Sequence, residues 1–375
     1  MAADGAILVV GGYGEVGAGV ARRLARMFPN RVTVAGRNMG RATSAAVAVG
    51  YGASARVLDV SRRGIGRELD GVCAVVVCID QEETHFVEAC LSRGIHYVDV
   101  TARHEFMLMV EALDDEARRS GATAILSVGV APGLTNLLAA RAARQMPGLD
   151  RVDILVELGV GDRHGRAALE WALCNLNTAF EVQAVEGRRS VRSFGESCRL
   201  NFAGKPSQPA YRFNFPDQHV VVRTLGIPAA STWVRFSSRV LTRLVATLAR
   251  QGTGRLRSPW ATQLMVWMLR YVHVGSDRCG VAVHAKGDGE ESIVMGVVGS
   301  GEARMTAIAC AETVRQLVAG DPEPGVFHSE QLIDLDAVVR ALEGEMRDFE
   351  ATLSSARTAD DPRERSGAAV ATPGQ

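Results

Sequence analysis

Residues 6–24 read AILVVGGYGEVGAGVARRL, and this stretch decides the fold of the chain. Its apolar start is typical of a short parallel strand that is buried on both faces. Gly12, Gly14 and Gly17 follow with the spacing G-x-G-x-x-G, in which glycines permit a tight turn, close approach of a pyrophosphate and close packing of the next helix. Gly11, Gly14 and Gly17 fit G-x-x-G-x-x-G equally well, so both registers stay open. In either register, the stretch predicts a strand, turn and helix that bind a dinucleotide on the free amides of the helix N-terminus.

The end of the second predicted strand, residues 32–35, indicates which dinucleotide is bound. An NAD site carries an acid about 20 residues after the glycines, but here Arg37 stands in that place and Asn38 follows it. A guanidinium pairs with a phosphate that a carboxylate would repel, so Arg37 favours NADP over NAD. The alternative is that Arg37 is a solvated turn residue. The predicted cofactor contacts are Gly11, Gly12, Tyr13, Gly14, Glu15, Val16, Arg37, Asn38, Asp59, Val60, Cys78 and Ile79.

The composition is that expected of a cytoplasmic enzyme. The chain has 375 residues, 47% of them hydrophobic, which is enough for a large core and for domains of roughly 150 residues each. Its formal net charge is zero, so no global charge predicts nucleic-acid binding. The seven cysteines form no C-x-x-C pair, which predicts reduced thiols and no metal site. The first strand begins almost at once and no apolar run reaches transmembrane length, so we expect neither a signal peptide nor a membrane span.

Strands and helices alternate along the first third of the chain. After the capping pattern Asp80–Glu83, residues 84–93 predict a helix, as do residues 107–119. Alternation of this kind predicts an α/β fold, a Rossmann-type doubly wound parallel sheet whose ligand crevice lies beyond the carboxyl ends of the strands. Further strands are predicted at residues 56–60, 72–78, 96–100 and 124–128, so Gly12, Arg37, Asp59, Cys78, Asp99 and Gly129 should converge at that edge.

The middle of the chain predicts a second, mixed α/β domain. Residues 152–158 alternate like a half-exposed strand, residues 166–180 predict a helix, and residues 188–202 and 220–224 suggest antiparallel strands.

Residues 235–270 hold seven arginines and no acid. Arg235, Arg239 and Arg243 are spaced to share one face of a helix, opposite Leu241, Leu244, Val245 and Leu248. Such a helix packs on a core with a solvated basic rim, lines a pocket for carboxylates, or lies on an anionic membrane. The first arrangement is the expected one, and a membrane surface is the least expected partner.

Four segments resemble the saccharopine dehydrogenase (reductase) family, which includes carboxynorspermidine synthase-like enzymes. They are the glycine turn, VAGRN at 34–38, ACLSRGIHYVDVT at 89–101 and GVAPGLTN at 129–136, with a looser likeness at 297–307 and 325–330. The resemblance implies a Rossmann domain that is interrupted by a mixed α/β substrate domain. After the substrate domain, the chain returns to the Rossmann domain. We therefore expect an NADP-binding domain over 1–135, a substrate and dimerisation domain over 136–300, a return to the first domain over 301–354 and a disordered tail over 355–375.

The resemblance also implies an activity. Family members use NADPH to reduce an imine that forms between an amine and a carbonyl compound. The expected partner is therefore a small carboxylated amine or carbonyl substrate. The expected assembly is a homodimer. Many relatives carry an acid before the Pro-Gly pair, but this chain has Ala131 before Pro132 and Gly133, so the resemblance does not identify the substrate.

Imine chemistry needs proton transfer, and the end of the fifth strand offers Asp99, Thr101, His96 and His104. Strand alternation places Asp99 and Thr101 on one face, so we expect these two to carry the reaction. A loop carboxylate that binds backbone amides is the alternative for Asp99, and a core histidine is the favoured alternative for His96. Two other functions stay open: an aldehyde or acyl dehydrogenase that uses Cys78 as nucleophile, and a non-catalytic NADP-binding sensor or scaffold.

Overall fold

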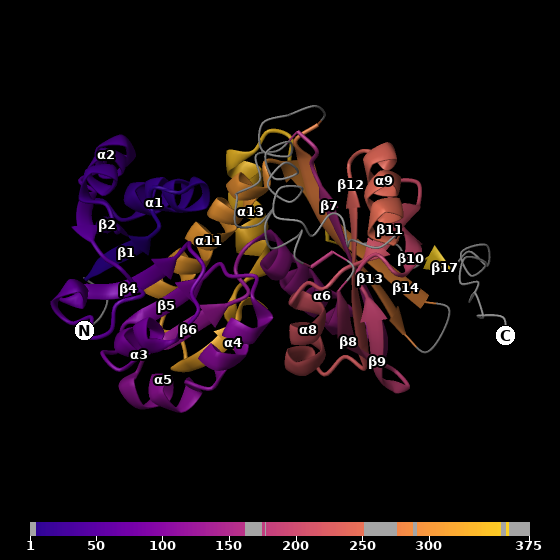
Figure 1. Cartoon of the computed structure of the whole chain (residues 1–375), viewed down its shortest axis with the longest axis horizontal. Helices are drawn as coiled ribbons and strands as arrows, with labels where there is room; N and C mark the ends of the chain where they lie inside the picture. The colour runs from indigo at the N-terminus through magenta and orange to yellow at the C-terminus, as the bar shows by residue number, and fades with distance from the viewer. Residues whose placement is uncertain are drawn as a thin grey trace. The chain divides into compact units, whose positions relative to one another are not determined.

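The computed structural model describes residues 5–161, 175–176, 178–250, 276–287, 291–353 and 358–359 (Figure 1). The chain forms two compact units. The first comprises Met1–Leu137, Phe215–Asp217 and Gly299–Phe349, and the second comprises Leu138–Asn214, Gln218–Val298 and Glu350–Gln375. Most of the predicted helix at 166–180, residues 251–270 of the arginine-rich segment and most of the predicted disordered tail lie outside the described residues.

The first unit is built on a seven-stranded parallel sheet, which confirms the predicted Rossmann-type fold class. The central strands are apolar and fully buried, as the VIL-rich sequence predicts for a sheet that helices cover on both faces. The strand order is β15-β6-β5-β4-β1-β2-β3. The bounds are β1 Ala6–Val10, β2 Val32–Gly36, β3 Ser54–Val57, β4 Val72–Val77, β5 His96–Asp99, β6 Thr123–Leu126 and β15 Gly325–His328.

Helices lie on both sides of this sheet, with α1, α2 and α11 on one side and α3, α4 and α5 on the other (Figure 1). Helix α11 packs along α1 and carries α13 on its other side. The bounds are α1 Glu15–Met27, α2 Met39–Val49, α3 His85–Leu91, α4 His104–Glu111, α5 Asp114–Ser120, α11 Glu302–Ala319, α12 Ser329–Leu332 and α13 Leu335–Glu345.

Three sequence predictions for this unit need correction. The third strand spans Ser54–Val57 instead of 56–60, because Asp59 binds Ser61 in a turn. The helix predicted over 107–119 is two helices, α4 and α5, separated at residues 112–113. The acidic capping pattern at Asp80–Glu83 does not cap a helix, since α3 begins at His85 with Thr84 as its N-cap and no side-chain cap bond.

The second unit is built on a mixed sheet in the order β10-β11-β12-β7-β13-β14-β16, with β17 also pairing with β14. Strand β7 pairs in parallel with β12 and antiparallel with β13. A separate hairpin joins β8 (Ala179–Ala184) to β9 (Gly187–Arg192). The other bounds are α6 Thr135–Gln145, β7 Leu149–Leu158, β10 Ser197–Leu200, β11 Gln208–Arg212, α8 Asp217–Leu225, β12 Ala229–Phe236, α9 Arg239–Arg250, β13 Arg278–Gly287, β14 Glu291–Ser300, β16 Glu350–Thr352 and β17 Thr358–Ala359.

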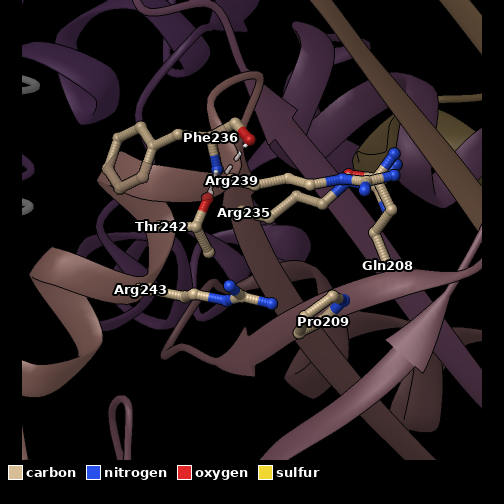
Figure 2. Close-up of a pocket in the computed structure, with 7 residues that line it drawn as sticks. All are labelled: Gln208, Pro209, Arg235, Phe236, Arg239, Thr242 and Arg243. Atoms are coloured by element: carbon tan, nitrogen blue, oxygen red, sulfur yellow. Dashed lines mark hydrogen bonds between the residues drawn. The ribbon is translucent and has the colours of Figure 1, made fainter.

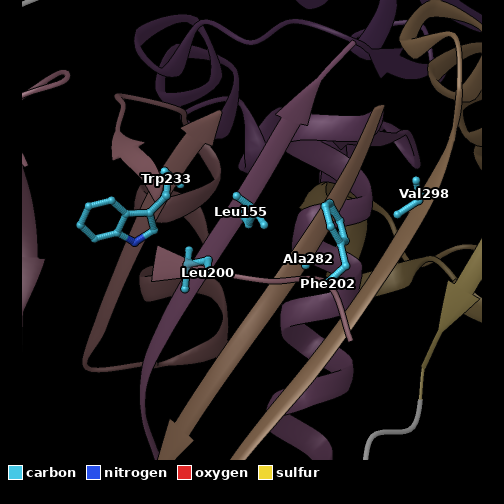
Figure 3. Close-up of a cluster of buried hydrophobic side chains, with 7 residues drawn as sticks. Leu155, Leu200, Phe202, Trp233, Ala282 and Val298 are labelled. Carbon is cyan, nitrogen blue, oxygen red and sulfur yellow. The ribbon is translucent and has the colours of Figure 1, made fainter. Parts of the chain in front are cut away.

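One face of this mixed sheet carries a compact apolar core. Its members come from β7, β10, β11, β12, β13 and β14 and from the loop after β10 (Figure 3). Trp233 is the largest, and its indole Nε1 donates a 2.8 Å hydrogen bond to Asp153, so the polar end of the ring is paired. The cluster comprises Leu155, Leu200, Phe202, Ala210, Trp233, Ala282 and Val298.

Two predictions for this unit are wrong. Residues 220–224 lie in helix α8, although their valines favour strands, because Val220 and Val221 are buried as part of the helix that Asp217 begins. Arg235 lies in strand β12, so it does not share a helical face with Arg239 and Arg243. Within the described residues, no helix is long and apolar enough to cross a membrane.

Candidate cofactor and proton-transfer site

The glycine turn between β1 and α1 is held by close backbone contacts. Gly11 has a φ of 74°, a conformation that glycine adopts at little cost. A Cβ on Gly17 would lie 2.3 Å from the Gly11 carbonyl oxygen, and a Cβ on Gly12 would lie 2.9 Å from the Val9 oxygen. Gly11, Gly12 and Gly17 are therefore sterically required, and Gly17 lets α1 pack directly against the turn.

Gly14 differs from its neighbours because a side chain there would meet little protein. Among the described residues, the Gly11 carbonyl oxygen at 3.2 Å is the one atom within 4 Å of an added Cβ. Gly14 is also the N-cap of α1 and offers no side-chain acceptor to its first turn. A phosphate fits this end of the helix, because it supplies the acceptor and the negative charge that a helix N-terminus attracts. The predicted contacts Tyr13, Glu15 and Val16 flank this position.

The end of β2 presents a cationic corner. Arg37 is exposed, and the Arg41 guanidinium lies 4.4 Å from the centre of the Tyr13 ring. That ring packs on Gly36, where a Cβ would lie 2.4 Å from it. Asn38 is the N-cap of α2 and accepts a 2.9 Å hydrogen bond from the Arg41 amide, so its side chain has a structural role. Arg41 was not among the predicted contacts, although a second arginine one helical turn after Arg37 is a readable signal.

Asp59 and Val60 follow β3 on the same edge. The Asp59 carboxylate accepts hydrogen bonds from the Ser61 hydroxyl at 2.7 Å and from the Ser61 amide at 3.1 Å. These bonds, with the charge of Arg37 as a smaller cause, lower the pKa of Asp59. The carboxylate therefore stabilises a turn and lies close enough to Arg37 to interact with its charge.

Cys78 and Ile79 follow β4 beside the glycine turn. The Cys78 amide donates to the Val10 oxygen at 3.0 Å, and Ile79 is 41% exposed although it is apolar. Burial of the thiol, with a further contribution from the charge of Asp99, raises the pKa of Cys78 to about 12. The thiol is therefore protonated at neutral pH, which does not suit a nucleophile.

Asp99 lies at the end of β5 in a buried hydrogen-bonded network. The Tyr97 hydroxyl donates to Asp99 Oδ2 at 2.5 Å, and the Thr101 amide donates to Asp99 Oδ1 at 2.7 Å. Gln81 Nε2 donates to Asp99 at 3.1 Å and to Tyr97 at 2.6 Å. Asp99 has no exposed surface, and Tyr97, Thr101 and Gln81 around it are also buried.

Burial raises the pKa of Asp99 from its ordinary value of 3.8 to about 7, and the charge of Asp80 adds to this effect. The hydrogen bonds from Tyr97 and Thr101 oppose it. Gln81 Oε1 is buried and receives no hydrogen bond from the described residues, so it is an open acceptor beside the carboxyl. Asp99 can thus hold or release a proton near neutral pH, as a proton-transfer group must.

This pKa has a consequence for stability. An acid with a raised pKa in the folded state stabilises the fold fully below its unfolded pKa, and this contribution is lost as the pH rises towards the folded pKa. The free energy of unfolding of the wild type, relative to Asp99→Asn, should fall by up to roughly 1.4 kcal/mol per pH unit between about pH 4 and about pH 7. Urea unfolding of both proteins across this range measures the difference, and a difference that does not change with pH would contradict the raised pKa.

The other predicted proton-transfer residues are His96, Thr101 and His104, and only Thr101 is hydrogen-bonded to Asp99 among the described contacts. His96 is at the start of β5, away from the carboxyl edge, where its Nδ1 accepts a 3.1 Å hydrogen bond from the Thr123 amide and burial lowers its pKa. Thr101 is buried beside Asp99, and its hydroxyl accepts a bond from the Arg103 amide at 3.2 Å. His104 begins α4. The structure therefore brings Asp99 and Thr101 together and places His96 elsewhere.

A second buried network at this edge was not found from the sequence. Ser127, directly after β6, lies 2.7 Å from His328 Nδ1, and His328 Nε2 lies 2.9 Å from Glu111. Ser127 has a φ of 55°, and His328 ends the edge strand β15. Because 200 residues separate Ser127 from His328, only the pairing of β15 with β6 brings them together. The Pro132–Gly133 pair follows β6 in a largely buried loop over Val130–Leu134.

Within the described ranges, no group of three or more histidine, cysteine or acidic side chains is arranged to hold a metal ion.

Comparisons with known proteins identify the family of the first domain and the fold. A family model, the saccharopine dehydrogenase NADP binding domain, matches residues 7–125. A solved structure of apo saccharopine dehydrogenase (L-Glu forming) from Saccharomyces cerevisiae is similar, with 13% identity, a TM-score of 0.61 and coverage of 93% of this chain and 100% of that chain. At that identity, the likeness shows the fold alone.

Two further structures are less similar. A myo-inositol dehydrogenase from Corynebacterium glutamicum has 13% identity, a TM-score of 0.43 and coverage of 93% and 99%. An oxidoreductase domain protein from Kribbella flavida has 12% identity, a TM-score of 0.42 and coverage of 93% and 99%. The comparison with curated proteins gives no match. Residues 7–125 thus belong to the family of saccharopine dehydrogenase NADP-binding domains, which confirms both the family resemblance and the NADP cofactor predicted from the sequence.

Proposed function

We propose that this chain is an NADP-dependent oxidoreductase that acts on a C–N bond. It reduces the imine formed between a small amine or amino acid and a carbonyl compound, or oxidises the corresponding secondary amine. The observation that carries the proposal is the buried Asp99 carboxyl, with a pKa of about 7, at the same sheet edge as the NADP-binding glycine turn. The fold shared with the yeast saccharopine dehydrogenase supports the same class of chemistry.

The cofactor residues have separate roles in this proposal. NADPH supplies the hydride, so the chain has to hold it and orient it. Gly14 leaves room for the pyrophosphate at the N-terminus of α1, and Arg37 with Arg41 offers cations for the 2′-phosphate. Ile79 offers an exposed apolar surface next to the glycine turn.

Asp99 is the proton-holding group. Neither Asp99 nor Tyr97 has exposed surface, so Asp99 exchanges its proton through a water at the open acceptor Gln81 Oε1. Imine formation and reduction each need a proton, and a carboxyl with a pKa near neutrality can give and regain one at neutral pH. Thr101 fixes the carboxyl through its amide.

Cys78 supports the alternative function poorly. An aldehyde or acyl dehydrogenase needs a thiolate nucleophile, whereas burial and the charge of Asp99 keep the Cys78 thiol protonated. No described histidine hydrogen-bonds this cysteine. In a non-catalytic NADP-binding protein, Asp99 would serve only as a loop carboxylate that binds the Thr101 amide.

The choice of cofactor can be tested at Arg37. Arg37→Ala should weaken NADPH binding by about 1.5 to 3 kcal/mol, the usual range for a hydrogen bond to a charged group, and leave NADH binding nearly unchanged. Arg41→Ala, which also removes the cation over Tyr13, should weaken NADPH by less. Calorimetric titration of each variant with both cofactors measures these effects. Equal losses for NADPH and NADH would remove Arg37 from the 2′-phosphate site.

The substrate can be found with a panel of amines crossed with α-keto acids and aldehydes, with NADPH consumption as the readout. We expect turnover only when both an amine and a carbonyl compound are present, because the reaction needs their imine. Turnover with an aldehyde alone would instead support the Cys78 alternative. Ala131, which stands where many relatives carry an acid, is a reason to include amines of different charge in the panel.

A further inference from the structure

Helix α9 of the second unit leaves part of its apolar face exposed. Thr242, Ala246 and Ala249 on its inward side are at most 3% exposed, and the apolar residues Leu241 and Val245 are half-buried. Val240, Leu244 and Leu248, spaced by four residues, are 78%, 53% and 37% exposed. A surface helix normally buries its apolar stripe and exposes its polar one. We call Val240, Leu244 and Leu248 the apolar column.

Arg239 and Arg243 lie at the start of the same helix, and Arg235 lies in the neighbouring strand β12. By helical spacing Arg243 lies beside Val240, whereas Leu248 lies towards the other side of the helix. A shallow hollow that is open to solvent is lined by Arg235, Arg239 and Arg243 together with residues of β11 and β12 (Figure 2). Figure 2 shows the side chains of Arg239 and Arg243 extending from α9 towards Gln208 and Pro209. We call these three residues the arginine cluster.

The arginine cluster has more positive charge than its surroundings neutralise. Arg235 is 3% exposed and donates to Glu157 at 2.6 Å and to the Leu200 oxygen at 2.8 Å. Arg239 donates to the neutral Gln208 side chain at 3.1 Å. The Arg243 guanidinium has no hydrogen bond or ion pair within the part of the chain that the structure describes. Two guanidinium charges therefore lack a carboxylate partner among the described residues.

The sequence on either side of α9 is free of acids. Residues 218–276 contain no aspartate and no glutamate. A second copy packed through the same helix would therefore bring further arginines against Arg239 and Arg243. An anionic lipid surface supplies both an apolar layer and phosphate groups, and so complements the apolar column and the arginine cluster together.

We propose that α9 is a docking element for an anionic phospholipid membrane. The apolar column enters the interface between headgroups and acyl chains, and Arg239 and Arg243 bind lipid phosphates at the arginine cluster. The protein lies on the surface and does not cross it. Sequence analysis made the membrane surface the least expected partner of this helix. The sequence does not show which apolar residues of α9 face solvent, and the structure shows that the apolar column does.

The test is sedimentation of the full chain with vesicles of phosphatidylcholine, with and without phosphatidylglycerol, at low and high salt. We expect binding to the phosphatidylglycerol vesicles that weakens with salt, and little binding to phosphatidylcholine alone. Arg239→Gln with Arg243→Gln should reduce binding roughly 30-fold, since each arginine near an anionic surface contributes about fivefold. Val240→Asp should reduce it at least about tenfold.

Matched controls separate this site from general surface effects. Val47→Asp on α2 replaces a valine that is also 78% exposed, and Arg188→Gln on β9 replaces an arginine with an 81% exposed side chain. Both control variants should bind vesicles like the wild type.

Three results would overturn the proposal. One is a wild type that does not bind phosphatidylglycerol vesicles, as expected if another part of the chain covers the column. The second is a wild type that binds inorganic phosphate in calorimetry but does not bind vesicles, while the arginine variants do not bind phosphate. That result would indicate a soluble phosphate ligand. The third is a dimer in sedimentation velocity that Val240→Asp dissociates, which would show that a second copy covers the column.

Discussion

Gly14→Val should abolish NADPH binding, by more than roughly 100-fold, in a protein that stays folded. Among the described residues, an added Cβ at Gly14 has one neighbour within 4 Å, the Gly11 oxygen at 3.2 Å, so a shift of a few tenths of an ångström accommodates it. The valine methyl groups would instead occupy the N-terminal end of α1, where a pyrophosphate has to approach the backbone. Fluorescence titration with NADPH measures the loss, and circular dichroism checks the fold.

Two other glycines provide the comparison. Gly17→Val should damage folding itself, since its Cβ would lie 2.3 Å from the Gly11 oxygen. Gly344→Val puts the same side chain on helix α13, where no atom of the described residues lies within 4 Å of an added Cβ. This variant should leave NADPH binding unchanged. Intact NADPH affinity in a folded Gly14→Val protein would contradict the assignment of the turn.

Asp99→Asn should lower kcat by about 100-fold or more while NADPH binding is retained, the contribution expected of a positioned acid–base group. Asparagine keeps the shape of the side chain but cannot hold the proton. Since the pKa of Asp99 is raised to about 7, the wild type should show an inflection of kcat near that pH, and the variant should lack it. Single-turnover kinetics across pH measure both effects.

The controls for Asp99 are a cysteine and a second buried carboxylate. Cys78→Ser should turn over nearly as fast as the wild type, whereas it would be inactive if Cys78 were the nucleophile. Asp153→Asn removes a carboxylate that is 2% exposed in the second unit, where it binds Arg151 and Trp233. This variant should lose stability and keep the inflection. If Asp99→Asn and Cys78→Ser both turn over normally, neither residue takes part in the reaction.

The fold of the first unit could be predicted because its signals are local. Each buried strand is a short apolar run that ends in glycine or a polar residue, and the glycine turn at Gly11–Gly17 is encoded in consecutive residues. Helix boundaries were less accurate where the sequence carries competing signals. Asp80–Glu83 looked like a cap, but Gln81 turns inward to bind Asp99 and Tyr97.

The parts that were missed depend on contacts that are distant in sequence. Ser127, His328 and Glu111 meet only because β15 pairs with β6. The raised pKa of Asp99 comes from complete burial, which strand alternation does not reveal. Arg235 was placed on a helix by its spacing to Arg239, whereas Ser238 caps the start of α9 through the Leu241 amide, so the helix begins after the strand ends.

The most direct test of the proposed function is the fate of a deuteride from NADPH labelled at the transferred position. With a productive amine and carbonyl pair, we predict that deuterium appears on the carbon of the newly formed C–N bond of a secondary amine, as detected by mass spectrometry and NMR. The same product should form about 100-fold more slowly with Asp99→Asn. NADPH that binds tightly but yields no deuterated amine with any pair, or deuterium found only in an alcohol, would contradict an oxidoreductase of C–N bonds.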